Sequence, residues 1–228
     1  MTLKNNITAG LPGANDVWSV QDVRALLTTY QGITSKQLRA NLIDFLSEVA
    51  PLAQNLGIRL CCHPDDPPFS LLGLPRVMST SDDYSAVLDA VDLPANGATL
   101  CTGSLGVAQE FDGPRFVERH ADRIHFAHLR NTKRLPSLDT NSPNFYEAPH
   151  LEGDTNMVGT IRALMAEQRR RKASGRDDWQ IPMRPDHGHL LLDDILKETN
   201  AGYSAIGRLK GLAELRGVIK TFEHVFEA

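Results

Sequence analysis

The sequence predicts an α/β fold built on a parallel β-sheet, and three observations lead to this prediction. Short apolar runs alternate with longer segments whose apolar residues recur at helical spacing. This alternation is typical of strand–helix units, in which right-handed crossovers connect parallel strands. Four of the short runs end in side chains that are suited to binding a metal ion, and parallel strands present their C-terminal ends at one face.

The expected elements follow from apolar spacing, from Ser and Thr residues that can cap helices, and from glycines that end them. A polar loop or arm is expected over 1–15. Helices are expected over about 19–30, 34–56, 79–91, 102–120, 157–173, 190–198 and 204–226. Strands are expected over 58–63, 98–101, 124–128 and 181–184, with a long polar loop over 131–156.

Alternation within the strands predicts which side chains share a face. His63 falls on the face opposite Leu60, which leaves Leu60 free to pack on helices. By the same count, His128 shares its face with Ile124.

The four strand-end residues are His63, Cys101, His128 and Asp186. The first two intervals between them are near the roughly 30 residues that one unit of a (β/α)₈ barrel occupies, and the third contains the polar loop. Only four strands are expected, so the prediction is a TIM-barrel-type parallel sheet, about the C-terminal half of a barrel. We expect a single domain over 1–228, with an N-terminal arm and helices over 1–56 and strand–helix units with the metal site over 57–228.

Each of these residues also has a plain structural interpretation. His63 precedes the rigid segment PDDPP, which suits either a site loop or an ordinary turn. Taken alone, Cys101 is more often a small core residue and His128 a histidine with an ordinary hydrogen-bond partner. Asp186 lies in RPDHGH, where titratable groups are crowded as they are at many functional sites. A His₂CysAsp set favours zinc by ligand type, whereas an open site with added oxygens also suits Mn²⁺ or Fe²⁺.

Composition narrows the class of partner. The 228 residues carry a formal net charge of −4, which disfavours nucleic acid. Three cysteines, two of them adjacent, form no disulfide framework and fit a reducing compartment. No apolar run is long enough to span a bilayer, and no signal peptide is recognisable. We therefore expect a cytoplasmic protein that does not associate with membranes.

Other polar residues near the strand ends are candidates for handling a substrate. Arg184 and Arg130 could hold a substrate carboxylate through two hydrogen bonds, or could form surface ion pairs. Tyr203 stands in a Gly-rich segment without the spacing of a phosphate loop, and could serve as an acid or base.

The motifs together resemble the mannonate dehydratase family over nearly the whole chain. They are HPDDPP (63–68), GLPR (73–76), LCTGS (100–104), HLR (128–130), HLEGD (150–154), IPMRPDHGH (181–189) and GYSAIGRLKGLAELRGV (202–218). The two C-terminal motifs are long and specific. The resemblance covers the C-terminal part of the family's chain, so the N-terminal barrel strands are expected to be absent.

The resemblance implies a hydro-lyase that converts D-mannonate to 2-dehydro-3-deoxy-D-gluconate in hexuronate (glucuronate) catabolism. It implies a TIM barrel, Mn²⁺ or Fe²⁺ as cofactor, and His63, Cys101, His128 and Asp186 as the metal ligands. It also implies proton transfer by His187 and Tyr203. A homo-oligomer is expected, because half a barrel leaves two open sheet edges.

Two alternatives remain. One is a related metal-dependent sugar isomerase, which would leave the mass of its substrate unchanged. The other is an inactive truncated barrel that retains the metal ligands.

Overall fold

The computed structural model describes residues 18–136, 139 and 141–227. The arm expected over 1–15 lies outside these residues. The helices are α1 Val20–Thr29, α2 Ser35–Asn55, α3 Ser81–Ala90, α4 Thr102–Leu105, α5 Gly113–His120, α6 Met157–Ala173 and α7 Ala205–Glu227, with 3₁₀ turns η1 Ala121–Arg123 and η2 Leu192–Leu196. The strands are β1 Leu60–Cys62, β2 Asn96–Cys101, β3 Ile124–His128, β4 Thr132–Arg134, β5 Phe145–Glu147 and β6 Met183–Arg184.

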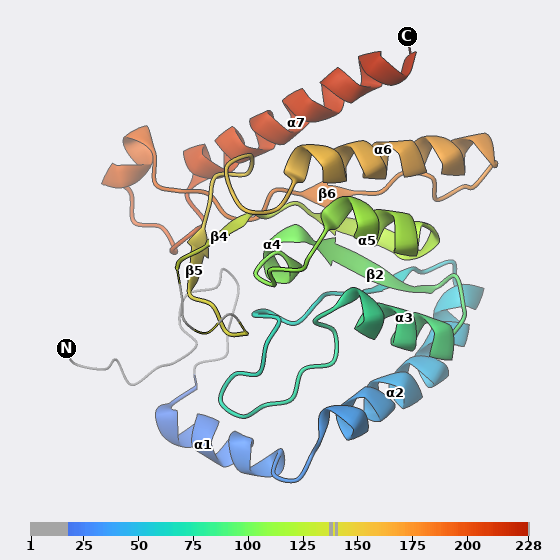
Figure 1. The fold of residues 1–228 in the computed structure, drawn as a ribbon, viewed down its shortest axis with the longest axis vertical. Coiled ribbons are helices and arrows are strands. Elements are labelled where there is room, and N and C mark those ends of the chain that lie inside the picture. The colour runs from blue at the N-terminus through green and yellow to red at the C-terminus, as the bar shows by residue number, and fades with distance from the viewer. Residues whose placement is uncertain (1–17, 137–138, 140, 228) are drawn as a thin grey trace.

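The central sheet is parallel and has the order β1-β2-β3-β6 (Figure 1). The prediction of an α/β fold with a parallel sheet is confirmed. In the part of the chain that the structure describes, the sheet does not close, so β1 and β6 are its edges. Proline at position 182 is tolerated beside β6 because only its carbonyl is used, as acceptor for the N–H of Ala127 at 2.9 Å.

Helix starts agree with the capping residues in the sequence. Ser19 and Thr80 each form a capping box with the aspartate three residues later, and the side chain of Thr34 caps α2. Asn156 caps α6, which has the bounds expected from the sequence. Local signals therefore determine these ends well.

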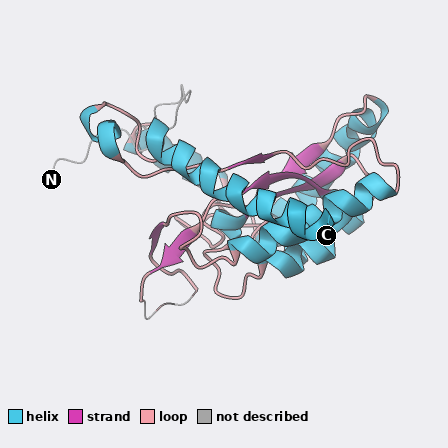
Figure 2. Cartoon of the chain, turned by 90° about the horizontal axis from the view of Figure 1, so that it is seen from above, coloured by secondary structure: helices cyan, strands magenta, loops and turns pink. Residues whose placement is uncertain are grey.

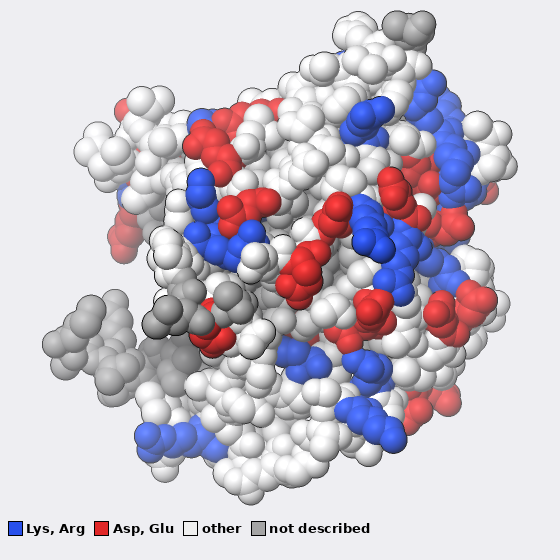
Figure 3. All heavy atoms as spheres, in the orientation of Figure 1, with Lys and Arg blue, Asp and Glu red and all other residues white. Residues whose placement is uncertain are grey.

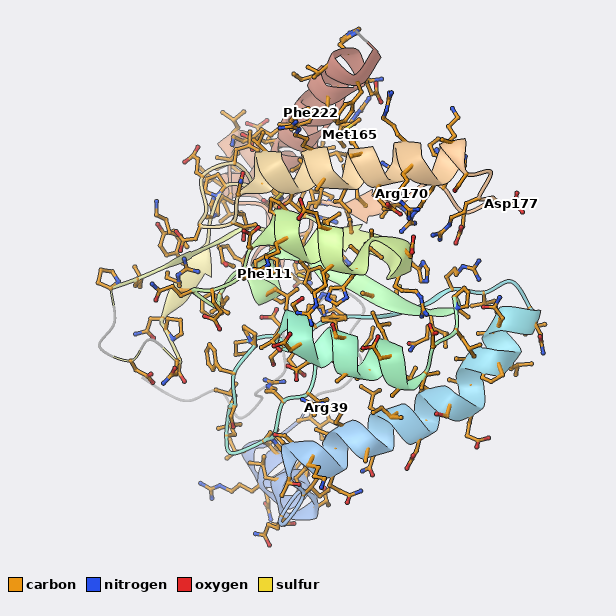
Figure 4. The ribbon with its side chains drawn as sticks, turned by 45° about the vertical axis from the view of Figure 1, so that its right-hand side comes forward. Arg39, Phe111, Met165, Arg170, Asp177 and Phe222 are labelled. Atoms are coloured by element: carbon orange, nitrogen blue, oxygen red, sulfur yellow. The ribbon has the colours of Figure 1, made fainter. Side chains whose placement is uncertain are left out.

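The core lies between the sheet and the helices that cover it. Leu100 and Ile124 come from the sheet, and α3, α5 and α6 contribute Val87, Phe116 and Ile161. Each fully buried side chain of this size stabilises the fold by about 1.5–3 kcal/mol. Helix α7 packs on α6, and Phe222 and Met165 come from these two helices (Figure 4).

Four expectations about local structure were wrong. The helix expected over 102–120 is interrupted, because α4 ends at Leu105 and α5 begins at Gly113 with its own cap at Asp112. The loop over 131–156 contains the antiparallel hairpin β4–β5, which stands apart from the central sheet (Figure 2). Segment 190–198 forms the 3₁₀ turn η2 and no α-helix. Leu192 there has φ +49°, and Leu191 at the cap position forms no side-chain cap hydrogen bond. Ile124 packs in the core and not on the face of His128, because the register of β2 and β3 shifts by one residue between Ala98 and Thr99.

Candidate metal and proton-transfer site

The C-terminal ends of the central strands bring three predicted ligands together. Cys101 and His128 are the last residues of β2 and β3 and are register partners in the ladder. His63 directly follows β1. The ligand atoms of His63, Cys101 and His128 all lie within 4.8 Å of one another, with His63 Nε2 3.1 Å from His128 Nδ1. Cys101 and His128 are buried, and His63 is exposed.

Asp186 lies outside this compact group of three but touches one member. Its Oδ2 is 2.9 Å from His128 Nε2, and its Oδ1 accepts a hydrogen bond from Arg184 at 2.6 Å. The residue has φ +70°, a left-handed conformation that Asp tolerates better than most residues. Its carbonyl accepts a hydrogen bond from Arg208 Nε at 2.9 Å, which helps to hold the backbone there.

Two buried ring nitrogens beside Asp186 lack hydrogen-bond partners among the described residues. They are His128 Nε2 and His187 Nδ1, which lie 2.9 and 3.1 Å from Asp186 Oδ2 without hydrogen-bond alignment. Buried polar atoms are normally satisfied, so an orphaned donor set of this kind indicates an absent partner. The imidazole and thiolate side chains of His63, Cys101 and His128, with the Asp186 carboxylate beside them, are donor types that fit a divalent metal ion.

The two acidic ligands of the site have lowered pKa values. Burial would raise the pKa of the Cys101 thiol, but hydrogen bonds from His128 and His63 outweigh it and lower the pKa to about 5. Burial likewise opposes ionisation of Asp186, yet its contact with His128 lowers the pKa to about 2. Both groups are therefore anionic at neutral pH, the form in which a thiol or a carboxyl group binds a metal. Although burial opposes it, contacts with Asp186 and Cys101 raise the pKa of His128 to about 9, so a metal ion would displace its proton on binding.

Neighbouring groups orient the ligands. His63 Nδ1 lies 2.8 Å from the Pro64 carbonyl, so it carries the proton and leaves Nε2 with a free lone pair. Ser104 donates its main-chain N–H to Cys101 Sγ at 3.4 Å, and its hydroxyl lies 3.2 Å from the same sulfur.

The two predicted proton-transfer residues lie together beside these ligands. The rings of His187 and Tyr203 pack edge to face with centroids 5.1 Å apart. Tyr203 is held by a parallel bridge between its main chain and that of Gly188, and by the Arg208 guanidinium, 5.5 Å from its ring centre. A side chain at Gly202 would meet the His187 ring at 2.6 Å, so His187 depends on glycine there.

The two arginines predicted to hold a substrate differ in their surroundings. Arg184 is partly exposed and pairs with Asp186, which leaves donors directed outward. Arg130 is only 6% exposed, and its guanidinium is bound by Glu147 and Asp66. The Arg130 guanidinium is therefore already bound by two carboxylates, although the residue also lines the cavity next to the site.

Sequence reasoning missed Glu147, Asp66 and Ser104 as members of the site. Asp66 and Ser104 lie within motifs next to two ligands, HPDDPP and LCTGS, so their position was a usable signal. Glu147 lies in the polar segment taken for a loop, and no local pattern distinguished it.

A cavity of about 640 Å³ adjoins the site and is walled by Glu147, His187, His150 and the Gly-rich start of α7. This volume is in the range of small-molecule sites. Charged side chains of both signs are interspersed over the face shown in Figure 3, with no broad field of one sign. Among the described residues, no helix is both long and apolar enough to cross a bilayer.

Comparison with known proteins identifies the family. The family model for D-mannonate dehydratase (UxuA) matches residues 1–228. The chain belongs to the D-mannonate dehydratase family. A mannonate dehydratase of Rhizobium meliloti (strain 1021) is 52% identical over 98% of this chain, and mannonate dehydratase 1 of Agrobacterium fabrum is 54% identical over 97%. The chain spans 55% of the length of each, so it covers about half of these family members.

Solved structures agree with this membership. Mannonate dehydratase from Streptococcus suis serotype 2 superposes with a TM-score of 0.76 at 27% identity, over 96% of this chain and 57% of that one. A xylose isomerase-like TIM barrel protein from Mycobacterium smegmatis superposes with a TM-score of 0.51 at 20% identity, over 80% of this chain and 52% of that one. The second likeness concerns the fold alone.

Proposed function

We propose that this chain takes part in the dehydration of D-mannonate to 2-dehydro-3-deoxy-D-gluconate, as a metal-dependent hydro-lyase of hexuronate catabolism. The observation that carries the proposal is the meeting of His63, Cys101 and His128 within 4.8 Å, beside Asp186, in a member of this family. The donor set fits Mn²⁺ or Fe²⁺ when substrate oxygens or water complete the coordination.

The reaction removes a proton from C2 and the hydroxyl group from C3 of the sugar acid. An acid protonates the leaving hydroxyl so that it departs as water, and the enol that results tautomerises to the 2-keto acid. When bound, the metal supplies a Lewis acid that stabilises negative charge developing on the substrate oxygens. His187 and Tyr203 then serve as the acid and base, since they lie in contact with each other at the rim of the site. Arg184, whose side chain is 44% exposed, is the candidate for holding the substrate carboxylate.

Metal content tests the ligand set without reference to turnover. Cys101→Ala and Asp186→Ala should each lose the bound metal, measured by elemental analysis of the protein after reconstitution and desalting. Cys61→Ala is the matched control, because Cys61 is an exposed thiol outside the group and should leave the metal in place. Full metal retention by Cys101→Ala would contradict the assignment.

Product analysis tests the reaction. D-mannonate incubated with the reconstituted chain should lose the mass of one water, and Tyr203→Phe should keep its metal but lose turnover. An unchanged mass with an altered sugar would identify an isomerase, and no conversion with metal bound would leave the chain as an inert part of a barrel.

We also propose that the sheet is part of a TIM-type barrel and that the protein is a cytoplasmic homo-oligomer. The open edges at β1 and β6 support association, since unpaired strand edges readily pair with other chains. Sedimentation or light scattering of the purified chain would measure its oligomeric state, and a monodisperse monomer would refute the proposed homo-oligomer.

A further inference from the structure

The end of the β4–β5 hairpin is attached to the segment that carries His187. His189 Nε2 lies 2.9 Å from the main-chain carbonyl of Glu147, and His187 Nδ1 lies 3.4 Å from the Glu147 carboxylate. His187 and His189 therefore both reach Glu147, one at its carboxylate and the other at its main-chain carbonyl. The next residue, Ala148, is fixed by a main-chain hydrogen bond to the Asn131 carbonyl at 3.0 Å. Glu147 is thus held through its backbone while its carboxylate reaches His187.

Arg130 fixes the direction of that carboxylate. Its Nε lies 3.0 Å from both Glu147 oxygens, and its Nη1 lies 2.5 Å from Asp66 Oδ2 and 3.4 Å from Ser104 Oγ. Asp66 follows β1, Ser104 lies in α4 directly after β2, and Glu147 is the last residue of β5. One buried guanidinium therefore joins these three segments. Rotating the Glu147 carboxylate would break charge-assisted hydrogen bonds to a guanidinium whose side chain is only 7% exposed, which keeps the carboxylate in one orientation.

The ring of His187 is confined on its other side. Gly202 lies so close that a side chain there would meet the ring, and Tyr203 packs on it edge to face. Its Nδ1 is buried next to the carboxylates of Asp186 and Glu147. We propose that Glu147, held by Arg130, is a positioning residue that fixes the ring of His187 with Nε2 directed to the substrate. Only the identity of the reaction that His187 serves rests on the proposed function.

Ring nitrogen signals of His187 test the contact directly. They are recorded by ¹⁵N–¹H NMR on the 228-residue chain supplied with Zn²⁺, a diamagnetic ion suited to the same donors, and assigned with His187→Gln. Glu147→Gln keeps the shape of the side chain and removes its charge, so it should shift the His187 signals. The His189 signals should stay unchanged, because the substitution leaves the main-chain carbonyl of residue 147, which His189 contacts, in place. Glu152→Gln, an exposed glutamate in the same segment, is the matched control and should change neither ring.

A double-variant cycle tests the part played by Arg130. Arg130→Lys cannot form the two-oxygen contact with Glu147, and should shift the His187 signals although residue 130 does not touch that ring. Combined with Glu147→Gln, it should add no further shift to the His187 signals, since both substitutions remove the same contact between Arg130 and the Glu147 carboxylate. Unchanged His187 signals in Glu147→Gln, or additive shifts in the double variant, would overturn the inference.

Kinetics separate this inference from the proposed function. If the wild-type chain dehydrates D-mannonate, Glu147→Gln should lower kcat by about 10- to 100-fold with KM little changed, as misplacement of a reacting group does. A raised KM with unchanged kcat would mean that Glu147 binds substrate instead, and would overturn the inference. If the wild-type chain forms no product, the proposed function fails for this chain, and the NMR signals still decide whether Glu147 positions His187.

Discussion

Arg171 is predicted to carry far more stability than its neighbour Arg170. Arg171 is 1% exposed. Its Nε donates to the Glu167 carboxylate at 2.7 Å, and its Nη2 donates to the Ile124 carbonyl at 2.9 Å and to the Ala121 carbonyl. It therefore fastens α6 to η1 and to the first residue of β3. Arg170 shares the same glutamate from a side chain that is 53% exposed, on the side of α6 toward η1 (Figure 4).

The loss in the free energy of unfolding depends on which polar groups each substitution leaves without a partner. Arg171→Met leaves the Ala121 and Ile124 carbonyls without this donor, at a cost of about 1–3 kcal/mol each, and removes the charged hydrogen bond to Glu167, worth about 1.5–3 kcal/mol. Such losses overlap, so we expect about 3–5 kcal/mol, the range for breaking a buried ion pair. Arg170→Met removes contacts of a half-exposed guanidinium with Glu167 and with the exposed Asp122. Glu167 keeps its bond to Arg171, so we expect the loss to stay near the 0–1 kcal/mol of exposed pairs, about 1 kcal/mol at most.

Thermal or urea unfolding of the two variants measures the difference. At roughly 2–4 °C per kcal/mol for a chain of this size, Arg171→Met should lower Tm by about 6–20 °C and Arg170→Met by about 4 °C or less. Equal losses from the two substitutions would refute the reasoning, because burial would then not decide the contribution of the pair.

Two further predictions concern conformation and pH. Gly202→Ala and Gly32→Ala place the same residue at φ +81° and +82°, so both should lose about 1–2 kcal/mol of stability. Only Gly202→Ala should also disturb the His187 NMR signals, because the space at Gly32 is open; equal signals in both variants would contradict the contact. Burial and the charge of Arg119 lower the pKa of His120 to about 4, below the usual 6.5, so the unfolded chain binds more protons between these values. Stability should therefore fall as pH drops from 6.5 to 4, by up to about 3 kcal/mol from this residue, and urea titrations should show a smaller fall in His120→Gln; the same fall in both proteins would remove His120 as its source.

Local signals explain most of what the sequence predicted correctly. Helices begin where Ser19, Thr34, Thr80 and Asn156 can cap them, because a cap depends only on residues within the same turn. The strand-end argument also foresaw that His63, Cys101 and His128 would meet, since parallel strands align their C-terminal ends.

The errors arose where packing overrides a local pattern. The strands of the hairpin are three residues long, too short to show alternation. The face of Ile124 was wrong because one extra residue in β3 cannot be seen without its partner strand. Glu147 was missed because its role depends on Arg130, which reaches it only in the folded chain.

The hydrogen-bonded ladder between β2 and β3 fixes the separation of two residues of the site. Cys101 and His128 stand opposite each other in register, so their backbones are held apart by the spacing of neighbouring strands and by nothing in the loops. Insertions on the connections that leave these strands can therefore remodel what surrounds a ligand without stretching this pair. Relatives on the same scaffold are free to diverge in specificity while the sulfur and the imidazole keep their separation.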